Sequence, residues 1–142
     1  MTTTEVKEYF RQIRKEQSEI MHLIEMSRRE ELSLLPKGIS YDSDKVQSSP
    51  EDTLCIKASK IADLQNEIDK SIVRLKEKRA KAESYIGRLE SSNEREVMRW
   101  YYIDNDFGKL LSWQQVAEKM GYTEKYILKV HGTALLNLSK IL

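Results

Sequence analysis

The feature that most constrains the fold is an apolar stripe that runs through residues 54–89 at alternating spacings of four and three. This spacing is typical of a long helix with one apolar face. Charged residues fill most other positions, so the helix must cover its stripe by packing on another helix. Gln65 and Arg79 interrupt a stripe otherwise made of Leu54, Ala58, Ile61, Ile68, Ile72, Leu75, Ala82, Ile86 and Leu89.

The nearest packing partner is a less regular stripe in the first part of the chain. It consists of Val6, Phe10, Ile13, Gln17, Ile20, Ile24, Ser27, Glu31 and Leu34. Between the two stripes, residues 36–52 are rich in Pro, Gly, Ser and Asp, which break helices and favour turns. Pro50, followed by two acids, is a favourable start for the second helix. Within this loop, Tyr41 and Val46 either dock on the helix pair or on a partner, or belong to a plain solvated connection.

Two arrangements would bury both stripes: an antiparallel hairpin within one chain, or a coiled coil between chains. Polar residues at seam positions often set register or partner number, which favours self-association. The alternative is that they lie at the seam edge and reach solvent. We therefore expect residues 1–90 to form an oligomerisation region that acts through Ile13, Ile20, Ile24, Ile61, Ile68, Ile72 and Leu75.

The last part of the chain predicts two short helices joined by a tight turn. Ser112 and Gln115 form a capping-box pattern, and Gly121 is suited to the left-handed residue that ends a helix. Thr123 then caps a second helix. Two helices around a Gly-containing turn form the unit that places its second helix in the major groove of DNA. Apolar positions follow the helical period at Trp113, Val116, Ala117 and Met120, and again at Ile127, Val130, Ala134, Leu135 and Leu138.

Residues 112–123, SWQQVAEKMGYT, with the apolar positions up to Leu138, resemble region four of bacterial sigma factors. Residues 94–102 resemble the helix that leads into it. Residues 41–50 and the helix after them resemble small regulators encoded by phages and prophages, related to the ArpU and RinA late transcriptional activators. The resemblance implies a sigma-like helix-turn-helix domain in residues 91–142. It also implies sequence-specific DNA binding in phage transcription control, in the cytoplasm of a bacterial host.

The exposed face of the second helix predicts the DNA contacts. Sigma region four carries several arginines there, whereas this chain has Glu124, Tyr126 and Leu128, which argues against a usual minus-35 promoter element. Glu suits a cytosine amino group, Lys a guanine edge or phosphate, and Tyr or Leu a thymine methyl group. Trp100, Tyr101, Trp113 and Tyr122 are expected mostly in the small core. The predicted DNA-binding residues are Ser112, Thr123, Glu124, Lys125, Tyr126, Leu128 and Lys129.

The charge balance limits how strongly one copy can bind DNA. The net charge is +1, and residues 93–142 hold seven Lys or Arg against six Asp or Glu. Phosphate neutralisation supplies most non-specific affinity, so useful binding to double-stranded DNA is expected to need a homo-oligomer. The same near-neutral charge supports an alternative, a protein-interaction module that contacts host RNA polymerase with little DNA binding. A small terminase-type DNA-packaging subunit is a third option.

Several classes of protein are not expected. Neither His22 nor His131 has metal-ligand spacing, and we expect His131 on the helix surface. Cys55 is the only cysteine and is expected to be half-buried. We predict no catalytic site, no enzyme activity, no cofactor, no metal and no membrane segment or leader. The expected fold is all-α, with a long-helix hairpin or coiled coil in residues 1–90 and the helix-turn-helix in residues 91–142.

Overall fold

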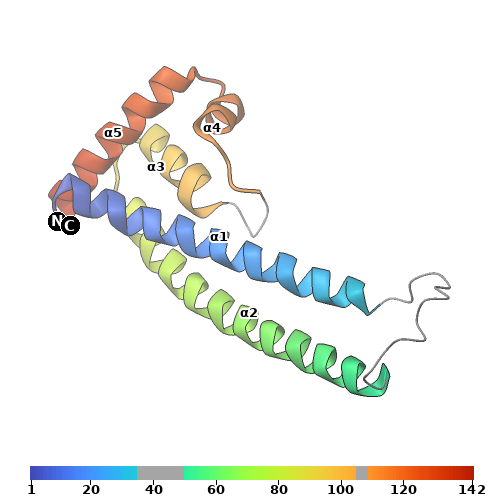
Figure 1. Ribbon diagram of the computed structural model, residues 1–142. Coiled ribbons are helices and arrows are strands. Elements are labelled where there is room, and N and C mark those ends of the chain that lie inside the picture. Colours follow the sequence, from blue (N-terminus) through green and yellow to red (C-terminus); the bar gives the residue numbers. More distant parts are fainter. Residues whose placement is uncertain (35–49, 105–108) are drawn as a thin grey trace. The chain divides into compact units, whose positions relative to one another are not determined.

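The computed structural model describes residues 1–34, 50–104 and 109–142, and every regular element in these ranges is helical. The expected all-α class is confirmed for this part of the chain. No helix within it is both long and apolar enough to cross a bilayer. Tyr41 and Val46, for which docking and a plain solvated connection are both open, lie outside the described residues. The elements, drawn in Figure 1, are α1 (Thr3–Ser33), α2 (Pro50–Ile86), α3 (Ser92–Met98), the π-helical turn η2 (Arg99–Ile103), α4 (Trp113–Met120) and α5 (Glu124–Ile141).

The chain divides into two compact units. The larger unit consists of Met1–Glu19 and Val73–Leu142, and the smaller unit of Ile20–Ile72. Each long helix therefore contributes one part to each unit. The division at residue 90 expected from the sequence stays a prediction.

The smaller unit contains the second part of α1 and the first part of α2. Ile20 and Ser27 of α1 and Leu64 and Ile68 of α2 are buried there. An ion pair joins the two helices, with 2.8 Å between Lys60 Nζ and Glu30 Oε1. Because this pair is largely exposed, it contributes little stability, and the apolar contacts hold this unit together.

In the larger unit, the first part of α1 lies beside the last part of α2. The Tyr9 and Tyr85 rings are 5.8 Å apart, and Lys78 pairs with Glu16. Residue numbers rise along one helix as they fall along the other, so the two helices are antiparallel there. The buried residues follow the two predicted stripes, and they are Val6, Phe10, Ile13 and Gln17 on α1 and Leu75, Ala82 and Ile86 on α2.

The residues predicted to drive oligomerisation differ in their exposure. Ile13, Ile20, Ile68 and Leu75 are buried within the chain itself. Ile24 is 39% exposed, and Ile61 and Ile72 are half-buried. Because Ile13, Ile20, Ile68 and Leu75 are already buried within one chain, they are not exposed to a second chain. Self-association through the seven predicted residues stays a prediction.

The three helices after α2 share a second part of the core. α3 and α4 both pack on α5. The turn between α2 and α3 is fastened by Arg95, whose Nη1 donates to the carbonyl oxygens of Leu89 and Glu90 at 2.6 and 3.0 Å. α3, α4 and α5 together enclose a core of Val97, Val116, Ala117, Ile127 and Val130.

The helix expected at residues 94–102 takes a different form at its end. It is α-helical to Met98 and then continues as the π-helical turn η2, closed by a 2.7 Å bond from Asp104 N to Arg99 O. This bond spans five residues instead of four, which widens the turn. Tyr102 is buried in η2, while Tyr101 is half-buried. No sequence pattern predicted this turn.

Candidate nucleic-acid interface

The start and end of α4 have the geometry that the sequence predicted. Ser112 Oγ accepts from Gln115 N at 3.3 Å, and Ser112 N donates to Gln115 Oε1 at 2.9 Å, which completes the capping box. Gly121 has φ of 75°, in the left-handed region. A Cβ at Gly121 would meet nothing within 4 Å, so the backbone angle and not space favours glycine there.

The turn then leads directly into α5. Thr123 Oγ1 accepts from Tyr126 N at 3.2 Å, so the predicted cap of the second helix is confirmed. All five apolar residues predicted for its inner face are buried, and this burial fixes α5 against α3 and α4. These residues are Ile127, Val130, Ala134, Leu135 and Leu138.

The opposite face of α5 is exposed at its first two turns. Tyr126 and Leu128 keep 39% and 44% of their surface exposed. The other predicted contact residues Ser112, Thr123, Glu124, Lys125 and Lys129 are exposed as well. The structure therefore leaves all seven accessible, and six of them lie together where α5 begins.

Tyr126 is held in place by its neighbours. Its ring lies 4.8 Å from the Tyr122 ring, and its hydroxyl accepts from Asn93 Nδ2 at 3.4 Å. A hollow of about 220 Å³ beside it includes Asn93, Lys129 and Thr133. Sequence reasoning missed Asn93, because it lies on α3, 33 residues away. The phenol ring thus has a supported orientation on an otherwise exposed surface.

A stack of side chains supports the first turn of α4. The Arg14 guanidinium lies 3.8 Å over the Tyr101 ring, which stacks at 3.7 Å and 8° on Trp113. Arg14 also donates to the carbonyl oxygens of Tyr101 and Leu111, both at 2.8 Å. A planar, permanently charged guanidinium suits this combined role. The sequence did not indicate Arg14, which ties α1 to the residue before Ser112.

The prediction that His131 lies on the helix surface is wrong. His131 is only 6% exposed, and its Nε2 is 2.8 Å from the Tyr102 hydroxyl. Burial, with the nearby positive charges of Lys7 and Arg11, lowers the pKa of His131 to about 4. Burial likewise raises the pKa of Tyr102 well above its ordinary value. The pair is therefore neutral at physiological pH and acts as part of the core.

Most of the aromatic residues expected in the small core do pack against it, namely Trp100, Tyr101 and Trp113, while Tyr122 is 44% exposed. The expectation that Cys55 is half-buried is wrong. Cys55 is exposed on α2, as are its neighbours Leu54 and Ile56. Among the described side chains, no group of three or more His, Cys, Asp or Glu is placed to hold a metal ion.

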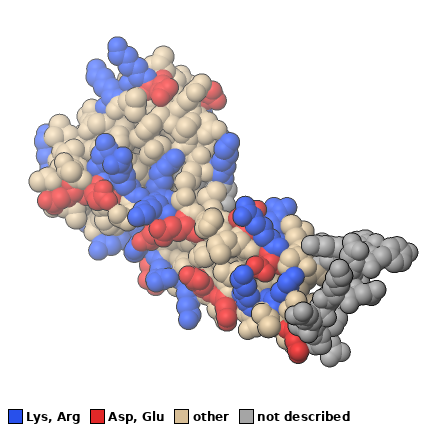
Figure 2. Space-filling model, in the orientation of Figure 1, with Lys and Arg blue, Asp and Glu red and all other residues tan. Residues whose placement is uncertain are grey.

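Charge is unevenly shared between the units, although it is mixed on the surface. On the face drawn in Figure 2, basic and acidic side chains are interspersed. The larger unit holds 17 Lys or Arg against 13 Asp or Glu, and the smaller unit 7 against 10. The larger unit therefore has a surplus of four positive charges, against one for residues 93–142 alone.

Comparison of the chain with protein-family models, with curated proteins and with solved structures finds no match.

Proposed function

We propose that the chain is a sequence-specific DNA-binding regulator of transcription, of the phage type that the sequence resembles, with α5 as its recognition helix. The observation that carries the proposal is the exposed first part of α5, presented after a tight turn by two capped helices. A helix held in this way fits the major groove of B-DNA, which is about 12 Å wide. Each exposed side chain there has a chemical role in DNA recognition.

The roles divide between bases and phosphates. Tyr126, oriented by Tyr122 and Asn93, offers an apolar ring to a thymine methyl group, as does Leu128. Glu124 suits a cytosine amino group, while Lys125 and Lys129 reach guanine edges or phosphates. In this arrangement, base contacts choose the sequence and the lysines position the helix.

A protein-docking function is the second candidate. Three large apolar side chains, Tyr122, Tyr126 and Leu128, are exposed together around the start of α5. Exposed aromatic and aliphatic residues of this kind also form the centre of protein interfaces. In that function α5 would bind a protein such as host RNA polymerase and contact DNA weakly.

Substitutions at Tyr126 and Lys129 separate these functions. A preferred duplex is first selected from a random library by the full-length protein. Tyr126→Ala is then expected to lose roughly 1 to 3 kcal/mol on that duplex, with little change on scrambled DNA. Lys129→Ala is expected to weaken binding to both duplexes. It should also reduce the salt slope, which is the slope of log affinity against log salt concentration, by about 0.9, the effect of one phosphate contact.

Leu136 and Lys140 provide matched controls, since both are exposed on the distal part of α5. Leu136→Ala and Lys140→Ala should leave DNA affinity unchanged, measured by fluorescence anisotropy at two salt concentrations. If the Tyr126 and Lys129 variants bind both duplexes like the parent but one of them no longer captures purified RNA polymerase, α5 is a protein-docking helix.

We also propose that the protein acts as a homo-oligomer, because a single copy has a small charge surplus for DNA binding. Its smaller unit exposes several large apolar side chains, namely Ile24, Leu32, Leu54 and Ile56. Light scattering during gel filtration at micromolar concentration is expected to give at least a dimer. A monomer would contradict the proposal and would mean that α1 and α2 pack on each other within one chain. A ring of eight or more subunits would instead favour a DNA-packaging subunit.

A further inference from the structure

The first helix carries a basic stripe that the proposed recognition helix does not include. Lys7, Arg11 and Lys15 follow one another at spacings of four, which places them on one face of α1. All three are exposed. They belong to the larger unit, as do α4 and α5.

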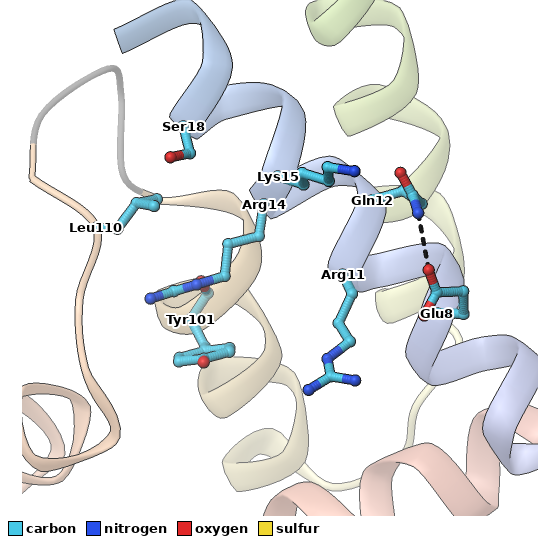
Figure 3. A pocket seen from close by; sticks show the side chains of 8 residues that line it. All are labelled: Glu8, Arg11, Gln12, Arg14, Lys15, Ser18, Tyr101 and Leu110. Carbon is cyan, nitrogen blue, oxygen red and sulfur yellow. Dashed lines mark hydrogen bonds between the residues drawn. The ribbon is translucent and has the colours of Figure 1, made fainter. Parts of the chain in front are cut away.

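Two of these residues line a groove of about 500 Å³. Figure 3 shows Arg11, Arg14 and Lys15 of α1 around it, with Tyr101 and Leu110 contributed by the segments before α4. Among the described residues of the lining, Glu8 is the only acid, and it accepts from Gln12 Nε2 at 2.7 Å, so this lining has a positive surplus. The remaining lining residue is Ser18.

The cations in this groove differ in what they already bind. Arg14 is committed to two carbonyl oxygens and the Tyr101 ring. Within the described part of the chain, neither Arg11 nor Lys15 forms a hydrogen bond or an ion pair. In contrast, Lys78 and Arg99 of the same unit are paired with glutamates. Two unpaired cations beside a hollow form a suitable receptor for an anion.

The groove lies next to the candidate DNA interface. Leu110 lines it, and Arg14 binds the Leu111 carbonyl, one residue before the N-cap of α4. The positive charges of Lys7 and Arg11 also act on His131 of α5. α4 has eight residues, so it is about 12 Å long, close to the width of the major groove. If α5 enters the major groove of DNA, the start of α4 is expected to reach the phosphodiester backbone at the edge of the major groove.

We propose that this groove holds the phosphodiester backbone of the DNA duplex that α5 enters, with Arg11 and Lys15 as its phosphate contacts. The inference rests on the proposed function, and it adds a second contact region on α1. Residues 93–142 alone have a surplus of one positive charge, which is small for DNA binding. The larger unit, which includes the groove on α1, has a surplus of four positive charges. Phosphate contacts of this kind are independent of sequence.

The test is the salt dependence of binding by full-length protein to a labelled random-sequence duplex of about three helical turns (~30 base pairs). The double variant Arg11→Gln with Lys15→Gln is expected to lower the salt slope by about two, or about 0.9 for each lost contact. Its affinity should fall by the same factor on the preferred and scrambled duplexes. The charge-retaining variant Arg11→Lys with Lys15→Arg should keep the parent slope.

The control is the double variant Arg28→Gln with Lys70→Gln, which also removes one arginine and one lysine charge, but from exposed positions in the smaller unit. It should keep the parent slope. If the groove variant also keeps that slope, or if the control lowers it equally, the groove is not a phosphate site, although α5 can still read DNA. If the parent binds no duplex, both the proposed function and the groove assignment are wrong.

Discussion

Replacing Phe10 with alanine is expected to destabilise the larger unit by roughly 3 to 5 kcal/mol, the range for truncating a large buried aromatic. Phe10 is fully buried. Its ring lies 5.3 Å from Tyr9 and 5.4 Å from Tyr102 of η2, so the substitution would leave a cavity between α1 and the segment before α4. This is a large fraction of the stability of an ordinary domain.

Urea denaturation measures this effect, because both tryptophans, Trp100 and Trp113, lie in the larger unit and report its unfolding by fluorescence. Leu32→Ala is the control, since Leu32 lies on the same helix and is 56% exposed. It should change the free energy of unfolding by less than about 0.5 kcal/mol. Equal midpoints for the Phe10 and Leu32 variants would mean that α1 does not contribute to the folding of residues 91–142.

Local features of the fold could be predicted because neighbouring residues determine them. Ser112 with Gln115, Gly121 and Thr123 each act within one turn of backbone, and their roles in capping α4 and α5 are confirmed. Pro50 likewise begins α2. The helical period correctly predicted the buried face of α5 and most of the stripe on α1. On α2 the predicted stripe is wrong at its start, because Leu54, Ala58 and Gln65 are exposed and Leu64 is buried instead.

Contacts between distant segments could not be predicted in the same way. A stripe indicates that Phe10 is buried but not that Tyr102 covers it. The bonds from Arg14 to Tyr101 and Leu111 join residues 87 and 97 positions apart, and nothing near Arg14 in the sequence indicates them. The groove on α1 depends on these contacts, so it could be identified only from the structure.

The wrong prediction for His131 has a different cause, because the helical period in the sequence already indicated that His131 is buried. It lies four residues after Ile127 and four before Leu135, on the apolar face of α5. Its polar ring suggested a surface position, but the Tyr102 hydroxyl provides a hydrogen-bond partner inside the core. The periodic pattern was the better guide, since a buried polar group needs a partner and not an exposed position.

The burial of His131 predicts that the protein loses stability in mild acid. The unfolded chain takes up a proton at the ordinary histidine pKa of 6.5, whereas the folded chain holds His131 neutral down to about pH 4. Between these values the unfolded state binds the extra proton, so stability falls as the pH is lowered through this window. The slope approaches 1.36 kcal/mol per pH unit, which amounts to about 3 kcal/mol across the window.

Urea denaturation at a series of pH values between 4 and 7 measures this loss. His131→Gln is expected to be less stable at pH 7, because it disturbs the contact with Tyr102, but its stability should depend less on pH by the same 3 kcal/mol or so. His22→Gln is the matched control, since His22 is exposed on α1, and it should follow the parent curve. If His131→Gln also follows the parent curve, the acid sensitivity comes from other groups, and His131 takes up its proton without unfolding the larger unit.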